Sequence, residues 1–114
     1  MEEQTIHSDL IRGHIDAILL RILRDGDHYG YGLMKQVQSL SDGQYELKEP
    51  SLYTSLKRLE KQGSIESYWG DESQGGRRKY YRITPQGCAQ YEEALAQWQW
   101  AKEIITKLLG GNDG

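Results

Sequence analysis

Residues 49–63 place hydroxyl and cationic side chains at a spacing that suits contact with a polyanion. At about 100° per residue in a helix, these side chains fall on one side. They are Ser51, Thr54, Lys57, Arg58 and Lys61. The opposite side is an apolar stripe formed by Leu52, Leu56 and Leu59. Such a helix fits the major groove of duplex DNA, where hydroxyls and cations meet phosphates and base edges. An ordinary solvated helix face is the alternative.

A second cationic cluster, Arg77-Arg78-Lys79, follows a glycine-rich segment. Alternating residues at 65–69 and 79–83 predict two strands, which the intervening segment joins into a hairpin. Cations at the edge of such a hairpin can bind phosphates or enter a minor groove. The alternative is that they protect an exposed strand edge from pairing with another chain.

The charge of the 114-residue chain is unevenly distributed. The net charge is −3, but residues 48–82 carry eight Lys or Arg against five Asp or Glu. That stretch is therefore +3 and the remainder −6. One surface is expected to attract polyanions such as DNA, while the rest is not. The length suits one small domain with a modest core, which association with a second copy would support.

Side chains that carry catalysis or bind metals are sparse. His7, His14 and His28 are not at metal-ligand spacing with Cys88, the single cysteine. We find no nucleophile–base pair and no carboxylate dyad in the sequence, so it predicts neither an enzyme nor a cofactor. The acidic start differs from a signal peptide. The longest aliphatic run, Ala17–Leu20, is far too short to cross a bilayer, and a cytoplasmic protein is expected.

Two further helices must position these elements. Ser8 can cap a helix over 8–25, and a second helix is predicted over 28–40. The first helix is apolar on more than one side, which predicts a second burial surface such as a partner chain. The residues that widen its apolar stripe are Leu19, Leu20 and Leu23. Three helices followed by a hairpin make a winged helix-turn-helix, a mainly α fold with a small β-hairpin.

The last helix is predicted over 85–109, with Thr84 as its cap. Its apolar residues repeat at 4, 3 spacing, as in a coiled-coil seam, and predict packing on the first helix of a second copy. Such a dimer would present two recognition helices to a pseudo-palindromic site. The residues expected at this interface are Ile11, Ile15, Ala94, Leu95, Trp98, Ala101, Ile105 and Leu108. We therefore expect a DNA-binding domain over 8–84, a dimerisation helix over 85–109, and flexible ends at 1–7 and 110–114.

Several more residues are candidates for DNA contact. Lys48 precedes the helix of 49–63, and Tyr53 lies beside its apolar stripe, where its hydroxyl can reach a phosphate. Gly30 and Gly32 open the second helix, and small residues there either admit a phosphate or allow close helix packing. The full set is Tyr29, Lys48, Ser51, Tyr53, Thr54, Ser55, Lys57, Arg58, Lys61, Gln74, Gly75, Arg77, Arg78 and Lys79.

Four segments of the chain form a distinctive set of motifs: Tyr29-Gly30-Tyr31-Gly32, 46–53, Lys57-Arg58-Leu59-Glu60 and 68–81. Together they resemble the PadR family of bacterial transcriptional regulators. The resemblance covers about residues 10–109, and the single C-terminal helix resembles the compact subfamily, which includes the multidrug-sensing regulators of lactic-acid bacteria. It implies a dimeric winged-helix repressor of genes for detoxification, efflux or phenolic-acid metabolism, released from DNA by an aromatic compound.

The resemblance also implies a site for planar aromatic ligands at the dimer interface. In drug-binding members a tryptophan of the last helix pairs with its mate across the dimer, and Trp98 matches that position. Its indole offers a wide stacking face, although plain packing in the dimer is the alternative. His14 and Lys102 are further candidates, and the cation of Lys102 favours anionic or neutral aromatics. Two other functions stay open: a winged-helix protein-interaction module, and a regulator whose dimer interface is closed to ligands.

Overall fold

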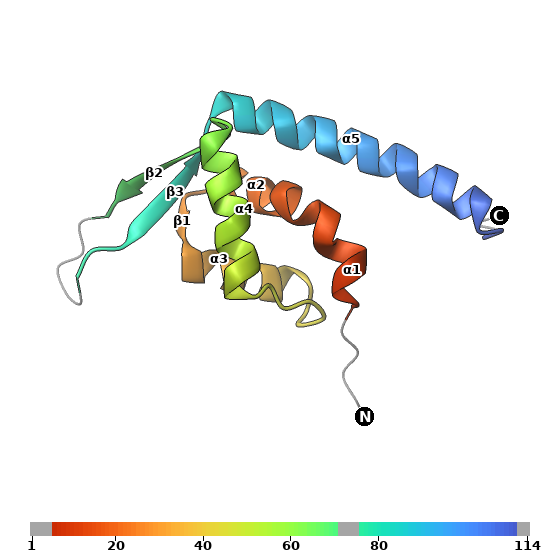
Figure 1. Cartoon of the computed structure of the whole chain (residues 1–114), viewed down its shortest axis with the longest axis horizontal. Coiled ribbons are helices and arrows are strands. Elements are labelled where there is room, and N and C mark those ends of the chain that lie inside the picture. Colours follow the sequence, from red (N-terminus) through yellow and green to blue (C-terminus); the bar gives the residue numbers. More distant parts are fainter. Residues whose placement is uncertain (1–5, 71–75, 112–114) are drawn as a thin grey trace.

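The computed structural model describes residues 6–70 and 76–111 and shows a helical body with a β-hairpin at one end (Figure 1). The elements in chain order are α1 (Ser8–Ile11), the 3₁₀ helix η1 (Arg12–His14), α2 (Ile15–Arg24), β1 (His28–Tyr29), α3 (Gly30–Leu40), α4 (Glu49–Lys61), β2 (Ile65–Trp69), β3 (Lys79–Ile83) and α5 (Pro85–Leu108). The mainly α fold with a small hairpin is confirmed.

Helix α2 lies at the centre of the fold and packs against α3, α4, β3 and α5. The leucines that widen its apolar stripe are all buried inside this one chain. The second burial surface that this stripe predicts is therefore supplied by the chain itself and not by a partner chain, because α5 packs against α2. The core consists of Ile15, Leu19, Leu20, Ile22, Leu23, Leu33, Val37, Leu47, Leu52, Leu56, Leu59, Ile65 and Tyr81.

The single helix expected over 8–25 is interrupted. Residues 12–14 form a 3₁₀ turn between α1 and α2, at a point where Gly13 weakens the helix. The cap is also different: Nδ1 of His7, rather than the side chain of Ser8, accepts the N–H of Asp9 at 3.2 Å. The backbone N–H of Ile6 donates to Gln44 at 2.8 Å, so the chain is held from residue 6 onward. The predicted flexible ends otherwise fall largely on 1–5 and 112–114, outside the described residues.

The predicted hairpin is part of a three-stranded antiparallel sheet with strand order β1-β3-β2. His28 and Tyr29, expected in the second helix, instead pair with Tyr81 and Tyr80 of β3. On the other side of β3, Tyr68 of β2 pairs with Tyr80. The two residues leave the helix because glycines follow them and because the ladder of β3 satisfies their backbone groups.

Helix α4 follows the prediction closely. Lys48 takes the extended conformation of a helix cap, and Pro50 lies in the first turn, where its missing N–H costs nothing. The chain leaves the helix at Gly63, whose φ of 82° favours glycine. The three leucines of the apolar stripe are buried, which fixes the polar side of α4 toward solvent.

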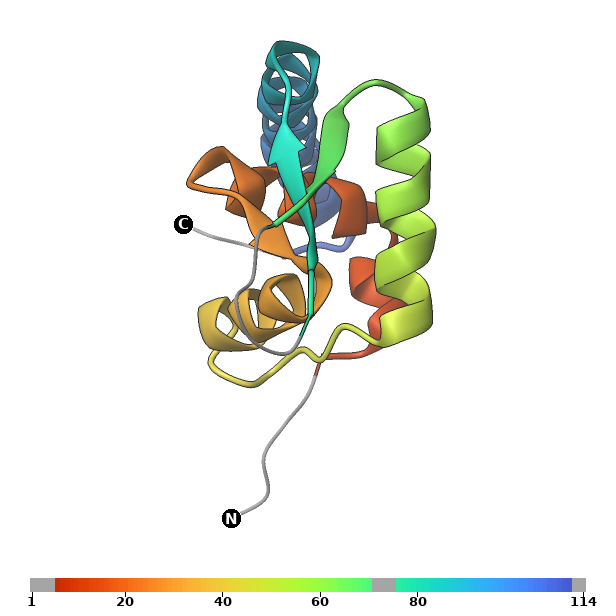
Figure 2. The ribbon, with the colours of Figure 1, turned by 90° about the vertical axis from the view of Figure 1, so that its left-hand side faces the viewer.

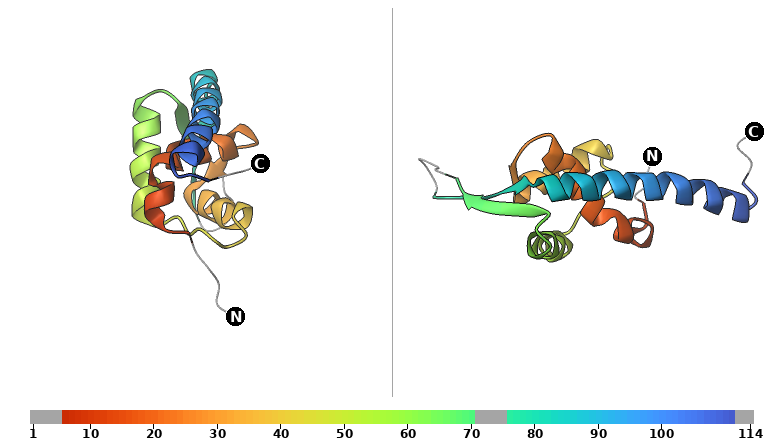
Figure 3. Two further views of the ribbon diagram at one scale, coloured as in Figure 1. Left: turned by 90° about the vertical axis from the view of Figure 1, so that its right-hand side faces the viewer. Right: turned by 90° about the horizontal axis from the view of Figure 1, so that it is seen from above.

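Helix α5 begins where the sequence predicts and then leaves the body of the protein. The hydroxyl of Thr84 accepts the N–H of Gly87 at 3.1 Å, and Pro85 is the first helical residue. Seen from above, the helix extends well past α1, opposite the hairpin (Figure 3). In the described parts of the chain, no helix is both long and apolar enough to cross a membrane.

Candidate nucleic-acid interface

The polar side of α4 forms the first part of the candidate interface. Ser51, Thr54, Lys57 and Lys61 are exposed, as their spacing predicts. A shallow hollow runs along this side, lined by Pro50, Tyr53, Thr54, Lys57, Arg58 and Lys61. Hydroxyls and cations therefore share one open strip of surface, as a groove-binding helix requires.

Ser55 does not belong to this strip. Only 2% of the residue is exposed, and its hydroxyl accepts Nη2 of Arg58 at 3.2 Å. Ser55 lies between Thr54, which is exposed, and Leu56, which is buried, and its side chain points toward the core like that of Leu56. The expectation that Ser55 contacts DNA is therefore wrong, because its side chain is inside the protein.

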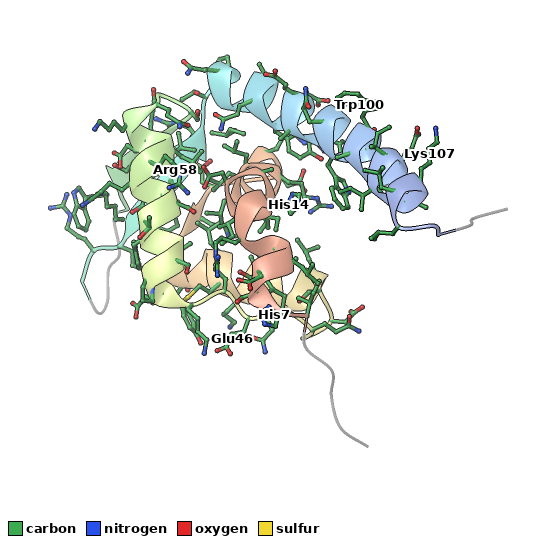
Figure 4. All side chains as sticks on the ribbon, turned by 45° about the vertical axis from the view of Figure 1, so that its right-hand side comes forward. His7, His14, Glu46, Arg58, Trp100 and Lys107 are labelled. Atoms are coloured by element: carbon green, nitrogen blue, oxygen red, sulfur yellow. The ribbon has the colours of Figure 1, made fainter. Side chains whose placement is uncertain are left out.

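Arg58 is exposed but already paired. Its Nε and Nη2 donate to the two carboxylate oxygens of Asp16 on α2 at 2.8 and 2.9 Å. Figure 4 shows Arg58 on the side of α4 that adjoins α2. The hydrogen bond to Asp16, and secondarily its charge, raises the pKa of Arg58 above its ordinary value. Arg58 thus differs from the two lysines of α4 in how much free charge it offers.

The hairpin supplies the second part of the candidate interface. Arg77, Arg78 and Lys79 are all exposed. The guanidinium of Arg78 lies 4.5 Å from the ring centroid of Tyr29, and that of Arg77 lies 5.7 Å from the ring of Trp69. Aromatic faces thus support both arginines without neutralising them. The candidates Gln74 and Gly75 lie outside the described residues.

A hollow lies between the hairpin and the helices α3 and α4, and several of the residues predicted to contact DNA line it. It is lined by Tyr29, Gly30, Tyr31, Tyr53, Arg78, Lys79 and Tyr81. Gly30 is buried here, and a Cβ at this position would overlap the hydroxyl of Tyr53 and lie 2.9 Å from its Cζ. Close packing therefore accounts for this glycine. Viewed from the hairpin end, α4 and the sheet stand side by side with α3 below them (Figure 2).

A set of tyrosines holds the hairpin against the body, which the sequence did not reveal. The ring of Tyr80 stacks on Tyr68 at 5.8 Å and meets Tyr29 edge-on at 5.6 Å. The Tyr68 hydroxyl donates to Asp27 at 2.6 Å. That hydrogen bond, with smaller effects of burial and of the Asp27 charge, raises the pKa of Tyr68. No local sequence signal ties Asp27 to Tyr68, which is 41 residues away.

The predicted ligand and dimer residues lie at the other end of the protomer. Trp98 is 42% exposed, and its ring meets that of His14 edge-on at 4.9 Å. Lys102 is exposed. Ile15 is part of the core, so its expected role in dimerisation is wrong, and Ile11 is half-buried against the same core. The predicted dimer residues that face solvent wholly or in part are Ile11, Ala94, Leu95, Trp98, Ala101, Ile105 and Leu108.

Several known proteins are similar to this chain in both sequence and fold. The Transcriptional regulator PadR-like family matches residues 19–93. A solved transcriptional regulator from Clostridium thermocellum is 44% identical, with a TM-score of 0.81 over 87% of this chain and 96% of its own. A PadR family transcription regulator from Clostridium difficile R20291 is 38% identical, with a TM-score of 0.73 over 84% and 98%.

The likeness extends to part of a longer protein. The transcriptional regulator YqjI of Escherichia coli K12 is 31% identical over 93 residues, which is 82% of this chain and 43% of that protein. The family match and the two solved structures agree with the winged helix-turn-helix described above. This protein is accordingly a DNA-binding regulator of transcription and not an enzyme. The chain belongs to the PadR-like family of transcriptional regulators.

Proposed function

We propose that the protein is a cytoplasmic repressor that binds a pseudo-palindromic promoter site as a homodimer. The observation that carries this proposal is the placement of two cationic elements at one end of the protomer. The exposed side of α4 and the cations of the hairpin meet at Tyr53, which lines both the hollow along α4 and the hollow that contains Arg78 and Lys79. A helix in the major groove with an adjacent hairpin on the backbone accounts for both.

Each exposed residue has a role in this arrangement that follows from its chemistry. Ser51 and Thr54, short and uncharged, suit base edges or phosphates at close range. The longer cations suit the phosphates on either side of the groove, and they are Lys48, Lys57, Lys61, Arg77, Arg78 and Lys79. Tyr29 and Tyr53 line the hollow between α4 and the hairpin, where a phosphate would pass.

A second copy is proposed to cover the far half of α5. Ile105 is 47% exposed and Leu108 79% exposed, and Trp98 lies on the same seam. In α1, Leu10 is also exposed. Apolar area of this kind gains free energy when it leaves water, so pairing of α5 with a partner's first helix is favourable. Two-fold symmetry would then place both copies of α4 on one side of the dimer.

Trp98 is proposed to bind a planar aromatic ligand at that interface. Its half-exposed ring already has one aromatic neighbour, His14, and keeps a face for another. Lys102 lies one helical turn further on and biases the site toward anionic or neutral compounds. A ligand that changes how α5 meets the partner would change the spacing of the two copies of α4 and relieve repression.

Fluorescence anisotropy with a labelled duplex from upstream of the gene tests the DNA-binding part of the proposal. The affinity should fall steeply with salt, because each phosphate neutralised contributes about −0.9 to the slope of log K against log salt concentration. Lys57→Gln should flatten that slope by about 0.9 for each phosphate that Lys57 neutralises in the wild type. Lys107→Gln, an equal charge change near the end of α5, is the control and should leave the slope unchanged. Equal effects of both variants would reject α4 as the binding element.

Sedimentation analysis tests the dimer separately. The wild type should be dimeric at micromolar concentration. Ile105→Glu places a carboxylate at an apolar contact and should weaken association about 100-fold or more, which corresponds to about 2.8 kcal/mol. Glu103→Gln, a change next to the seam in sequence but on an exposed polar residue, is the control. A wild type that stays monomeric at this concentration would refute the homodimer.

A further inference from the structure

Arg58 and Asp16 form the only ion pair among the described residues in which both carboxylate oxygens are held by one guanidinium. The Nε–Oδ2 and Nη2–Oδ1 distances are 2.8 and 2.9 Å. Nη2 also donates to the buried hydroxyl of Ser55 at 3.2 Å. The pair joins α4 to α2, two helices that pack on each other in the core. Three donor contacts therefore fix the guanidinium against the protein.

The carboxylate of Asp16 offers Arg58 what a DNA phosphate would offer. Both anions present two oxygens that match the fork of a guanidinium. The Asp16 side chain is 24% exposed and that of Arg58 is 48% exposed, so the pair is partly shielded from water. Shielding strengthens the attraction between the two charges relative to a fully exposed pair. A phosphate must displace Asp16 before it can use the same donors.

The neighbouring lysines of α4 are in a different situation. Lys57 and Lys61 line the same hollow as Arg58. Among the residues that the structure describes, neither lysine forms an ion pair. Of the three cations on α4, two are therefore free to neutralise phosphates and one is already neutralised.

We infer that Asp16 is a positioning residue that occupies Arg58 in place of a phosphate and thereby limits the affinity of α4 for DNA. This inference rests on the proposed use of α4 as the DNA-binding helix. Arg58 then fixes the seat of α4 on α2, while Lys57 and Lys61 bind phosphates. Removal of the Asp16 charge releases one additional cation per protomer to the DNA.

The salt dependence of binding to a random-sequence duplex measures this released cation directly and needs no knowledge of the operator. Four proteins form a double-mutant cycle: wild type, Asp16→Asn, Arg58→Gln and the double variant. In the wild-type background, Arg58→Gln should leave the slope of log K against log salt concentration unchanged. In the Asp16→Asn background, Arg58→Gln should make the slope less steep. The change in slope should be about 0.9 for each Arg58 that had bound a phosphate. Asp16→Asn alone should bind DNA several-fold more tightly.

The cycle separates release of Arg58 from the simple loss of a negative charge, because the latter persists in the double variant. Asp16→Glu keeps the charge and should retain a slope near that of wild type. If Arg58→Gln makes the slope less steep by the same amount with Asp16 present and with Asn at position 16, Arg58 binds DNA despite Asp16 and the inference is wrong. If Asp16→Asn weakens binding and flattens the slope, Asp16 presents Arg58 to DNA, and the inference is likewise overturned.

A second variant keeps the test valid should Asp16→Asn fail to fold. Arg58→Lys retains both charges but cannot hold Asp16 at two points, so it should give a steeper slope than wild type. A slope equal to or below that of wild type would overturn the inference. A Lys57→Gln variant with an unchanged slope would instead contradict the proposed role of α4, so the two failures are distinguishable.

Discussion

The phenol of Tyr53 on α4 lies directly against Gly30 at the start of α3. A Cβ at residue 30 would overlap the Tyr53 hydroxyl and lie 2.9 Å from Cζ. The pair therefore joins the first residue of one helix to the side of α4 that is proposed to face DNA. Tyr53 is half-exposed, so its position depends on the absence of a side chain at Gly30.

Gly30→Ala should displace the Tyr53 ring and weaken DNA binding about tenfold with a smaller effect on folding. Because the ring can swing outward, the loss of unfolding free energy should stay below about 2 kcal/mol. Thermal melting and anisotropy measure the two effects. Gly13→Ala is the control, since nothing lies within 4 Å of a Cβ added at that position. Unchanged DNA affinity in Gly30→Ala would show that the position of Tyr53 does not matter.

Gly87→Ala should act in the opposite way, on stability. A Cβ at this position would overlap the carbonyl oxygen of Ser64 and lie 2.7 Å from Cγ1 of Ile83. Backbone cannot move aside as a ring can, so a loss of about 1–3 kcal/mol in unfolding free energy is expected. Urea denaturation measures it. Gly13→Ala, with nothing within 4 Å of the added Cβ, should be neutral or slightly stabilising. Equal stabilities of the two variants would contradict the close packing at Gly87.

The hydrogen bond from Tyr68 to Asp27 should be visible as a pH dependence. Because the folded protein raises the Tyr68 pKa, the contribution of this bond to stability is complete below about pH 10, the ordinary tyrosine value. It is lost as the pH rises through the folded value. The stability difference between wild type and Tyr68→Phe should therefore be constant at neutral pH and shrink at high pH.

The same hydrogen bond predicts a shift in the titration of Tyr68 itself. Asp27→Asn removes the charge and the strong acceptor, so the Tyr68 pKa should move down toward the ordinary value. Ring resonances followed by NMR during an alkaline titration would show the change, with Tyr81, whose pKa is raised mainly by burial, as the internal reference. An identical Tyr68 titration in both proteins would mean that the bond does not form in solution.

Lys102 should set the charge preference of the proposed site at Trp98. Anionic and neutral planar dyes should quench tryptophan fluorescence at lower concentrations than cationic dyes of the same size. Lys102→Glu should reverse the order, whereas Lys107→Glu, farther along α5, should leave it unchanged. Tighter binding of cationic dyes to the wild type would contradict the assignment of Lys102. Absence of quenching by every dye would point to an interface closed to ligands.

Helices α4 and α5 were predictable because their signals are local. Pro50 and the leucines at 52, 56 and 59 define the start and buried side of α4 within a few residues of each other. Thr84 and Pro85 do the same for the start of α5. The exposed side of α4 follows directly, and with it most of the candidate interface.

The remaining features depend on residues that are distant in sequence. β1 exists because Tyr29 finds its partner at Tyr80, and no pattern near residue 29 signals that pairing. The pairing of Arg58 with Asp16 spans 42 residues and is equally invisible to periodicity. The wide apolar surface of α2 is typical of a helix at an interface between two chains, but it is equally typical of a helix buried within its own chain.

Gly87 lies in the first turn of α5, and its close packing against Ser64 and Ile83 has a consequence at long range. The 24 residues of α5 extend about 36 Å at about 1.5 Å each. A change of about 10° in the direction of the α5 axis at its first turn moves the far end of the helix by about 6 Å. In the proposed dimer, the two copies of α4 must meet successive turns of DNA about 34 Å apart. The close packing at Gly87, together with the packing of α5 on α2, would thus help to set which half-site separation the protein accepts.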